Sequence, residues 1–181
     1  MHQNRILILL CVGVLLLSIL ACGSATTDYP GSDNRCSSPL SGGDADTALS
    51  RISFEVPSNW SEIKHNQKYL AQGSLLTVFV FQTSAPPKTC VETMIQVVSG
   101  QSVVESYRMD ATNFYIDGKS AAMAVADGYF DSSKTAPFRG IYAGVGSGTW
   151  VYVFAWDSSG IEAVRTVADD ATFTIGTINI P

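Results

Sequence analysis

The sequence predicts an α+β fold in which helices cover a largely antiparallel β-sheet. The apolar residues 75–83 have the length and composition of a strand that is buried on both faces and is therefore central. Three more strands follow at 121–130, 138–145 and 149–156, and Gly146-Ser147-Gly148 joins the last two as a tight hairpin. Two segments with helical spacing interrupt and follow these strands, and this order of elements is typical of the α+β class.

The chain before residue 100 adds one more strand and the first helix. Apolar and polar residues alternate over 51–56, which predicts a half-buried strand. Thr89 and Glu92 have the spacing of a capping box, and apolar residues at helical spacing follow them. We therefore expect a helix that begins at Thr89 and ends near Gly100.

The second half of the chain contains one ambiguous stretch and a closing helix. Residues 103–116 fit a helix as well as a strand, and we favour a strand where they approach the turn Asp117-Gly118-Lys119. A second capping box, from Ser159 to Glu162, predicts the closing helix. Residues 173–180 alternate weakly, which leaves open a short strand or a segment packed across the sheet.

Short motifs in these elements resemble those of PsbP-like domains. Phe54-Glu55-Val56-Pro57-Ser58-Asn59-Trp60 is similar to the Phe-x-x-Pro-x-x-Trp opening of that family, and Ile116-Asp117-Gly118-Lys119-Ser120-Ala121 resembles its mid-domain turn. The order of the last elements also matches, so the resemblance covers residues 51–181. It implies an α/β/α sandwich and an accessory or interaction role, as in extrinsic photosystem II subunits and bacterial lipoproteins of that family. It supplies no catalytic residues.

The first 22 residues have the organisation of a secretory signal peptide. Arg5 precedes a continuous apolar run over 6–17, and the small residue Ala21 stands directly before Cys22. This junction resembles the lipobox of bacterial lipoproteins, which implies cleavage between Ala21 and Cys22 and acylation of Cys22 with diacylglycerol and palmitate. The alternative is an uncleaved anchor, but the apolar run of about 16 residues is shorter than the roughly 20 that span a bilayer.

Composition and charge divide the rest of the chain and limit its partners. Residues 22–50 are dominated by Gly, Ser, Thr, Asp and Pro, which predicts a flexible tether before a globular domain at 51–181. Removal of residues 1–21 takes away one basic and no acidic residue, so the net charge changes from −5 to −6. Without a Lys/Arg cluster, a nucleic-acid partner and electrostatic docking on lipid are not expected. The lipid anchor would hold the protein in the bacterial cell envelope, facing the extracytoplasmic side.

Besides Cys22, the predicted mature chain contains two cysteines, Cys36 and Cys90. Export to an oxidising compartment favours a disulfide between them, with two separate thiols as the alternative. They are 54 positions apart and neither belongs to a Cys-x-x-Cys pair, so metal and redox motifs are not indicated.

No catalytic or metal-binding pattern is apparent in the sequence. His65 is the single histidine after the signal, and a lone histidine in a polar turn is usually solvated. A Gly-x-Ser-x-Gly elbow is absent, and the glycines at 144–148 join two strands rather than a strand and a helix, as a phosphate loop requires. We expect neither an enzyme nor a cofactor.

One row of aromatic residues offers a possible binding face. Trp150, Tyr152, Phe154 and Trp156 share one face of the strand at 149–156, where they form either core or a groove for an apolar ligand or a partner. The sequence thus predicts an accessory domain that binds another envelope protein. The alternative is a carrier for a small apolar molecule, and nothing in the sequence indicates the oligomeric state.

Overall fold

The structure is a computed structural model that describes residues 35–181, apart from 37, 64–67, 101 and 111–113. The chain divides into two compact units, Met1–Gly31 and Ser32–Pro181, and the fold below is that of the second. The predicted lipobox at Ala21 and Cys22 lies outside the described residues, and so does His65. None of the helices in the described part is both long and apolar enough to span a membrane.

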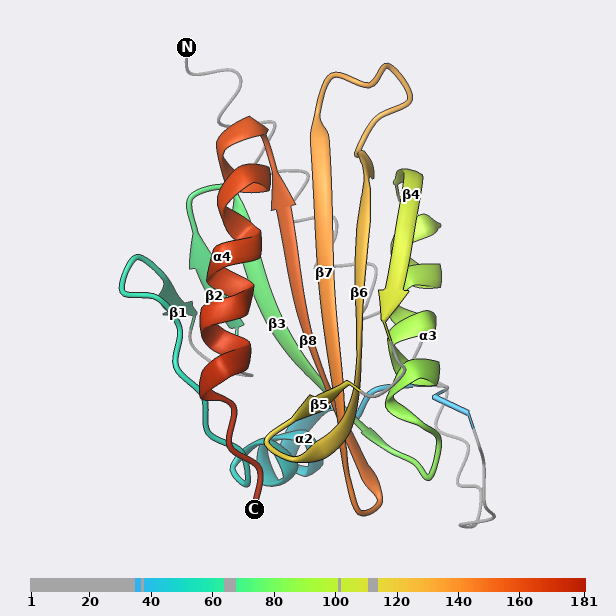
Figure 1. The fold of residues 1–181 in the computed structure, drawn as a ribbon, viewed down its shortest axis with the longest axis vertical. Coiled ribbons are helices and arrows are strands. Elements are labelled where there is room, and N and C mark those ends of the chain that lie inside the picture. Colours follow the sequence, from blue (N-terminus) through green and yellow to red (C-terminus); the bar gives the residue numbers. More distant parts are fainter. Residues whose placement is uncertain (1–34, 37, 64–67, 101, 111–113) are drawn as a thin grey trace. The chain divides into compact units, whose positions relative to one another are not determined.

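An eight-stranded antiparallel sheet forms the centre of the domain, which confirms the predicted fold class (Figure 1). β5 pairs with β6 alone and lies off the main path. Across the sheet the order is β1 (Ser61–Ile63), β2 (Lys68–Ala71), β3 (Ser74–Gln82), β8 (Trp150–Ser159), β7 (Pro137–Ser147), β6 (Lys119–Tyr129) and β4 (Val103–Asp110), with β5 at Tyr115–Ile116.

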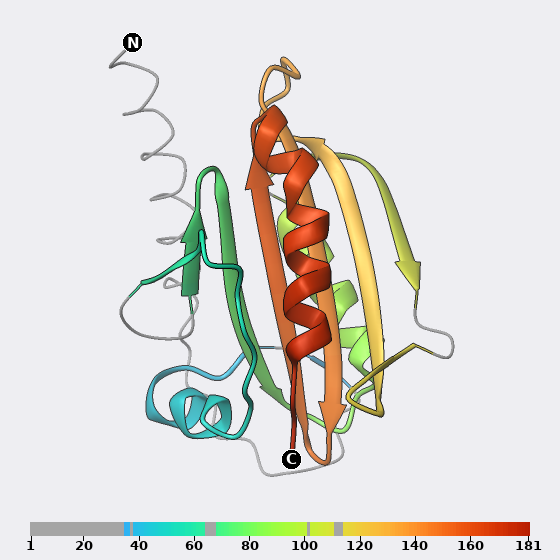
Figure 2. The same ribbon diagram turned by 60° about the vertical axis from the view of Figure 1, so that its left-hand side comes forward.

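Helices cover both faces of the sheet, but each face only in part. α4 (Ile161–Thr177) packs on β7 and β8, and α2 (Gly42–Leu49) packs against β3. The hydrophobic cluster on that face contains residues of both helices. α3 (Pro87–Ser99) lies on the opposite face, over β6, β7 and β8. Figures 1 and 2 show α4 in front of the sheet and α3 behind it.

The core is divided between these two faces by the alternation of β8. Tyr152, Phe154 and Trp156 point into the cluster beneath α4 and α2, whereas Val153 and Ala155 point into the cluster beneath α3. Successive strand residues face opposite sides, so a strand that is apolar on both faces must be covered on both. β8 lies between β3 and β7, as its composition predicts.

The alternation of apolar and polar residues over 51–56 reflects the burial of one side of this segment and not its pairing in the sheet. Ile52 is buried and Phe54 half-buried, yet the segment forms no strand beyond one bridge between Ser53 and Asn179. Instead it runs beside α4, where the Glu55 N–H donates to Thr177 Oγ1 at 2.9 Å. The predicted strand at 51–56 is therefore wrong, because the partner of this segment is a helix.

Both predicted capping boxes are wrong as well. α3 begins two residues before Thr89, with Pro86 at its N-cap, and α4 follows Gly160. Neither helix start has a side-chain capping hydrogen bond. In α3, Pro87 at the first helical position removes one of the N–H groups that a cap would otherwise have to satisfy, because proline has no N–H. α4 also continues to Thr177, so residues 173–177 of the tail are helical, and of the last residues only Asn179 forms a bridge, with Ser53.

The folded domain begins earlier than the predicted boundary at residue 51. Ala48 and Leu49 of α2 are buried, and the Tyr152 hydroxyl donates to the Ala48 carbonyl at 3.2 Å. Ahead of α2, the Leu40 N–H donates to the Val80 carbonyl at 2.7 Å. Leu40 therefore lies along the outer edge of β3. Only the part of the predicted tether before this segment stays a prediction.

A disulfide joins Cys36 to Cys90 in the first turns of α3, as predicted. The two Cα atoms are 5.0 Å apart, and both side chains are buried. The bridge fixes the segment before α2 to the face of the sheet that α3 covers.

Candidate functional site

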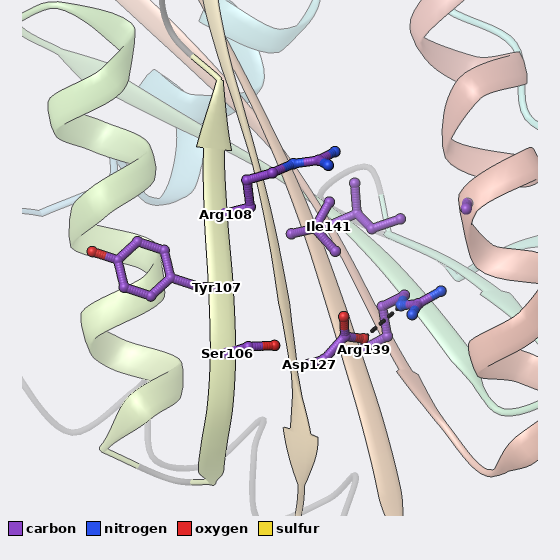
Figure 3. A pocket seen from close by; sticks show the side chains of 8 residues that line it. Ser106, Tyr107, Arg108, Asp127, Arg139 and Ile141 are labelled. Carbon is purple, nitrogen blue, oxygen red and sulfur yellow. Dashed lines mark hydrogen bonds and ion pairs between the residues drawn. The ribbon is translucent and has the colours of Figure 1, made fainter.

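The α4 face of the sheet is uncovered over β6 and β4. α4 packs on β7 and β8, and no helix of the described residues packs on the two outer strands from this side. A hollow of about 350 Å³ lies there, between α4 and β4 (Figure 3). Its lining consists of Ser106, Tyr107, Arg108, Val125, Asp127, Arg139, Ile141 and Ala168.

The floor of the hollow is apolar. Val125 of β6, Ile141 of β7 and Ala168 of α4 line it. Alternation on β6 places Val125 and Asp127 on this face, whereas Ala124 and Ala126 pack beneath α3. The small residues thus lie where a helix must approach closely, and the larger ones lie where no helix covers the strand.

An ion pair connects the floor to α4. Asp127 and Arg139 are direct cross-strand partners of β6 and β7, and Arg139 Nε donates to Asp127 Oδ1 at 2.6 Å. Arg139 Nη1 also donates to the Val164 carbonyl of α4 at 3.2 Å. The guanidinium is therefore fixed between sheet and helix, and some of its N–H groups remain available to a ligand.

A second arginine borders the hollow on the side of β4. Arg108 Nε lies 3.4 Å from Asp110 Oδ2, and the Arg108 side chain is 74% exposed. In Figure 3 it extends over the sheet towards Ile141, whereas Tyr107 points to the opposite side. The lining carries two arginines and one aspartate, a net charge of +1 in a chain of net charge −5.

This combination of charges and apolar surface defines the kind of ligand that fits the hollow. Two guanidinium groups beside an apolar floor suit a ligand with both a carboxylate and apolar groups. Within the described ranges, no group of three or more His, Cys, Asp or Glu side chains could hold a metal ion.

The aromatic row identified in the sequence lies in the core. Tyr152, Phe154 and Trp156 are at most 1% exposed. Trp150 is half-buried, with the Arg51 guanidinium 5.8 Å from its ring centroid. The interpretation of this row as a ligand or partner face is therefore wrong for three of its four members, because α2, α4 and residues 51–60 cover that face.

The sequence did not reveal the residues of the hollow, because they are brought together only by the pairing registers of β4, β6 and β7. Asp127 and Arg139 lie on either side of a turn, and a symmetric hairpin would have made them partners. Arg108 joins them only because β4 returns to pair with β6 after α3. The available signal was the opposite charges across the turn at 130–136.

A carboxylate on the other face of the sheet has a perturbed pKa. Burial raises the pKa of Asp157 to about 6, and the hydrogen bond from the Tyr142 hydroxyl, at 2.8 Å, opposes this shift. Burial also raises the pKa of Tyr142 well above its usual range. The ring of Tyr142 lies over Gly140, where a Cβ would be 2.2 Å from the hydroxyl oxygen, so only glycine leaves room for it.

The raised pKa of Asp157 predicts that stability falls as pH rises. The folded protein binds this proton more tightly than the unfolded chain, whose Asp pKa is near 3.8, so the loss occurs between about pH 4 and 6. We expect it to amount to on the order of 2–3 kcal/mol. In urea unfolding across this range, Asp157→Asn, which keeps an acceptor for Tyr142, should lack this component. Identical pH profiles for the two proteins would contradict the assignment.

The fold and the hollow define a small α+β domain with one partly uncovered sheet face. No protein-family model matches the chain, and neither does any curated protein, so the PsbP-like resemblance stays a prediction.

Among solved structures, the chain is similar to LpqN, which is involved in cell envelope biogenesis of Mycobacterium tuberculosis. The identity is 11% and the TM-score 0.49, over 72% of this chain and 83% of LpqN. A protein from Bacteroides thetaiotaomicron VPI-5482 matches at 13% identity and a TM-score of 0.46, over 72% of this chain and 45% of its own.

Proposed function

We propose that this protein is a lipid-anchored protein of the bacterial cell envelope whose domain binds another envelope protein and has no enzymatic activity. The lipobox at Cys22 supports the location. The observation that carries the binding role is the uncovered surface of β6 and β4, with its apolar floor and two arginines. A sheet face that no helix covers exposes surface that a partner can bury.

The carrier for a small apolar molecule remains the second candidate. A hollow of about 350 Å³ is within the usual range for small-molecule sites, roughly 300–1,000 Å³. The charged lining favours a partner that also has polar groups. Native mass spectrometry of the purified protein distinguishes the two candidates, since a carrier retains a small apolar ligand of defined mass.

Site-specific photo-cross-linking in membranes tests the binding role. A photoreactive residue at Ser106, which is exposed and lines the hollow, should capture one protein in near-stoichiometric amount. The same residue at Val97, which is 45% exposed on α3, should not. We expect Cys22→Ala to reduce the product from Ser106, because the unanchored protein leaves the membrane. Equal capture from both positions, or none from Ser106, would show that the hollow is not a partner site.

A further inference from the structure

We propose that the partner adds an extended segment as a further strand along β4, at Ser106–Asp110, and places an acidic side chain beside Arg108. This inference rests on the proposed function and specifies how the partner binds. Strand addition supplies affinity through main-chain hydrogen bonds, and the neighbouring hollow supplies specificity through a side chain.

β4 has the unpaired edge that such an addition requires. It is the last strand of the sheet, and its inner side pairs with β6. No segment among the described residues pairs with its outer side. At the other edge, β1 has only three residues, and Leu40 occupies the outer edge of β3 beyond β2. β4 is thus the longer edge strand of the described sheet, and alternate residues direct their N–H and C=O groups outward.

A β-bulge confines the addition to one part of β4. The register shifts between Val104 and Ser106, and it is regular from Ser106 to Asp110. Bulges and charged residues on an edge oppose unspecific pairing. An incoming strand must therefore match the regular part, where Arg108 is central and Tyr107 is 63% exposed.

The side chains of β4 specify the chemistry of the partner. Residues directly opposite each other on adjacent strands face the same side, so the residue opposite Arg108 lies next to the hollow. A carboxylate on the residue opposite Arg108 can form a bidentate pair with the guanidinium, and the net positive charge of the lining favours a negatively charged side chain at this position. The 3.4 Å contact of Arg108 with Asp110 is exposed and weak, so it can be exchanged for the partner. On the other side, Tyr107 favours an apolar neighbour.

Peptide selection with amide hydrogen exchange tests this inference. A library of random heptapeptides is selected against the full-length chain in detergent micelles, and exchange of the β4 amides is measured with the selected peptides. We expect peptides with Asp or Glu at one fixed position that slow exchange of the outward amides of Ser106–Asp110 at least tenfold. Arg108→Gln should weaken their binding about tenfold.

Lys88→Gln is the matched control. Lys88 is 55% exposed and lies 3.7 Å from Glu92, so it is also a cation in an exposed ion pair, but it belongs to α3 on the opposite face of the sheet. We expect this variant to bind the peptides normally. Strand addition is overturned if no peptide is selected, if the peptides protect other amides, or if Arg108→Gln binds them as well as the native protein does.

Failure of the inference and failure of the proposed function give different results. If photo-cross-linking from Ser106 captures a partner but no peptide protects β4, the partner binds the hollow without adding a strand. If peptides protect β4 but cross-linking in membranes captures nothing, the edge of β4 can accept a strand, but the proposal that the domain binds another envelope protein is wrong.

Discussion

Trp156→Ala is expected to destabilise the domain by about 3–5 kcal/mol, the usual cost of removing a large buried aromatic side chain. Trp156 is fully buried at the centre of the sheet, and its ring stacks on that of Phe154, with the centroids 6.0 Å apart. No neighbouring side chain can fill the space without breaking the packing beneath α4. Urea unfolding monitored by circular dichroism measures the loss.

Trp150→Ala is the control for this prediction. Trp150 occupies the same face of β8 but is only half-buried, so we expect a loss of about 1–2 kcal/mol. Neither variant should change cross-linking from Ser106 at temperatures where it is folded. Unchanged stability of Trp156→Ala together with lost binding would restore the aromatic row as a binding face.

Reduction of Cys36–Cys90 is expected to destabilise the domain by about 4 kcal/mol in the chain-entropy model, an upper value for a loop of about 55 residues. The bridge restricts the unfolded chain between the segment before α2 and α3. Because both sulfurs are buried, we also expect reduction to be slow in the native protein and fast in urea. Unfolding midpoints with and without dithiothreitol measure the effect.

The double variant Cys36→Ser/Cys90→Ser is the control for reduction. Its unfolding midpoint should equal that of the reduced native chain and should not respond to dithiothreitol. A native midpoint that dithiothreitol leaves unchanged, under conditions where thiol titration shows full reduction, would contradict a stabilising role for the bridge.

The sequence was sufficient for the elements whose pattern depends on burial alone. β3 and β8 are recognisable because they are apolar on both faces, and the β7–β8 hairpin because Gly148 adopts the positive φ of a tight turn. α2 was missed because its apolar face consists of Ala45, Ala48 and Leu49 within a stretch rich in glycine and serine. Small residues bury little area, so composition does not reveal them.

The candidate site was not predictable for a related reason. Its floor residues, Val125 and Ile141, look like ordinary strand residues, and only the position of α4 leaves Val125 uncovered. A helix that covers two strands rather than four is a property of tertiary packing.

The Cys36–Cys90 bridge also fixes the point at which the N-terminal part of the chain enters the domain. Around Cys36 the chain joins the sheet at the β7–β8 hairpin end, where Thr83 bonds to both Arg35 and Thr149. Arg139 lies about 27 Å farther along β7 from Ser147, at about 3.4 Å per residue. The ion pair at the floor of the hollow and the point where the chain enters the sheet therefore occupy opposite ends of the same strand.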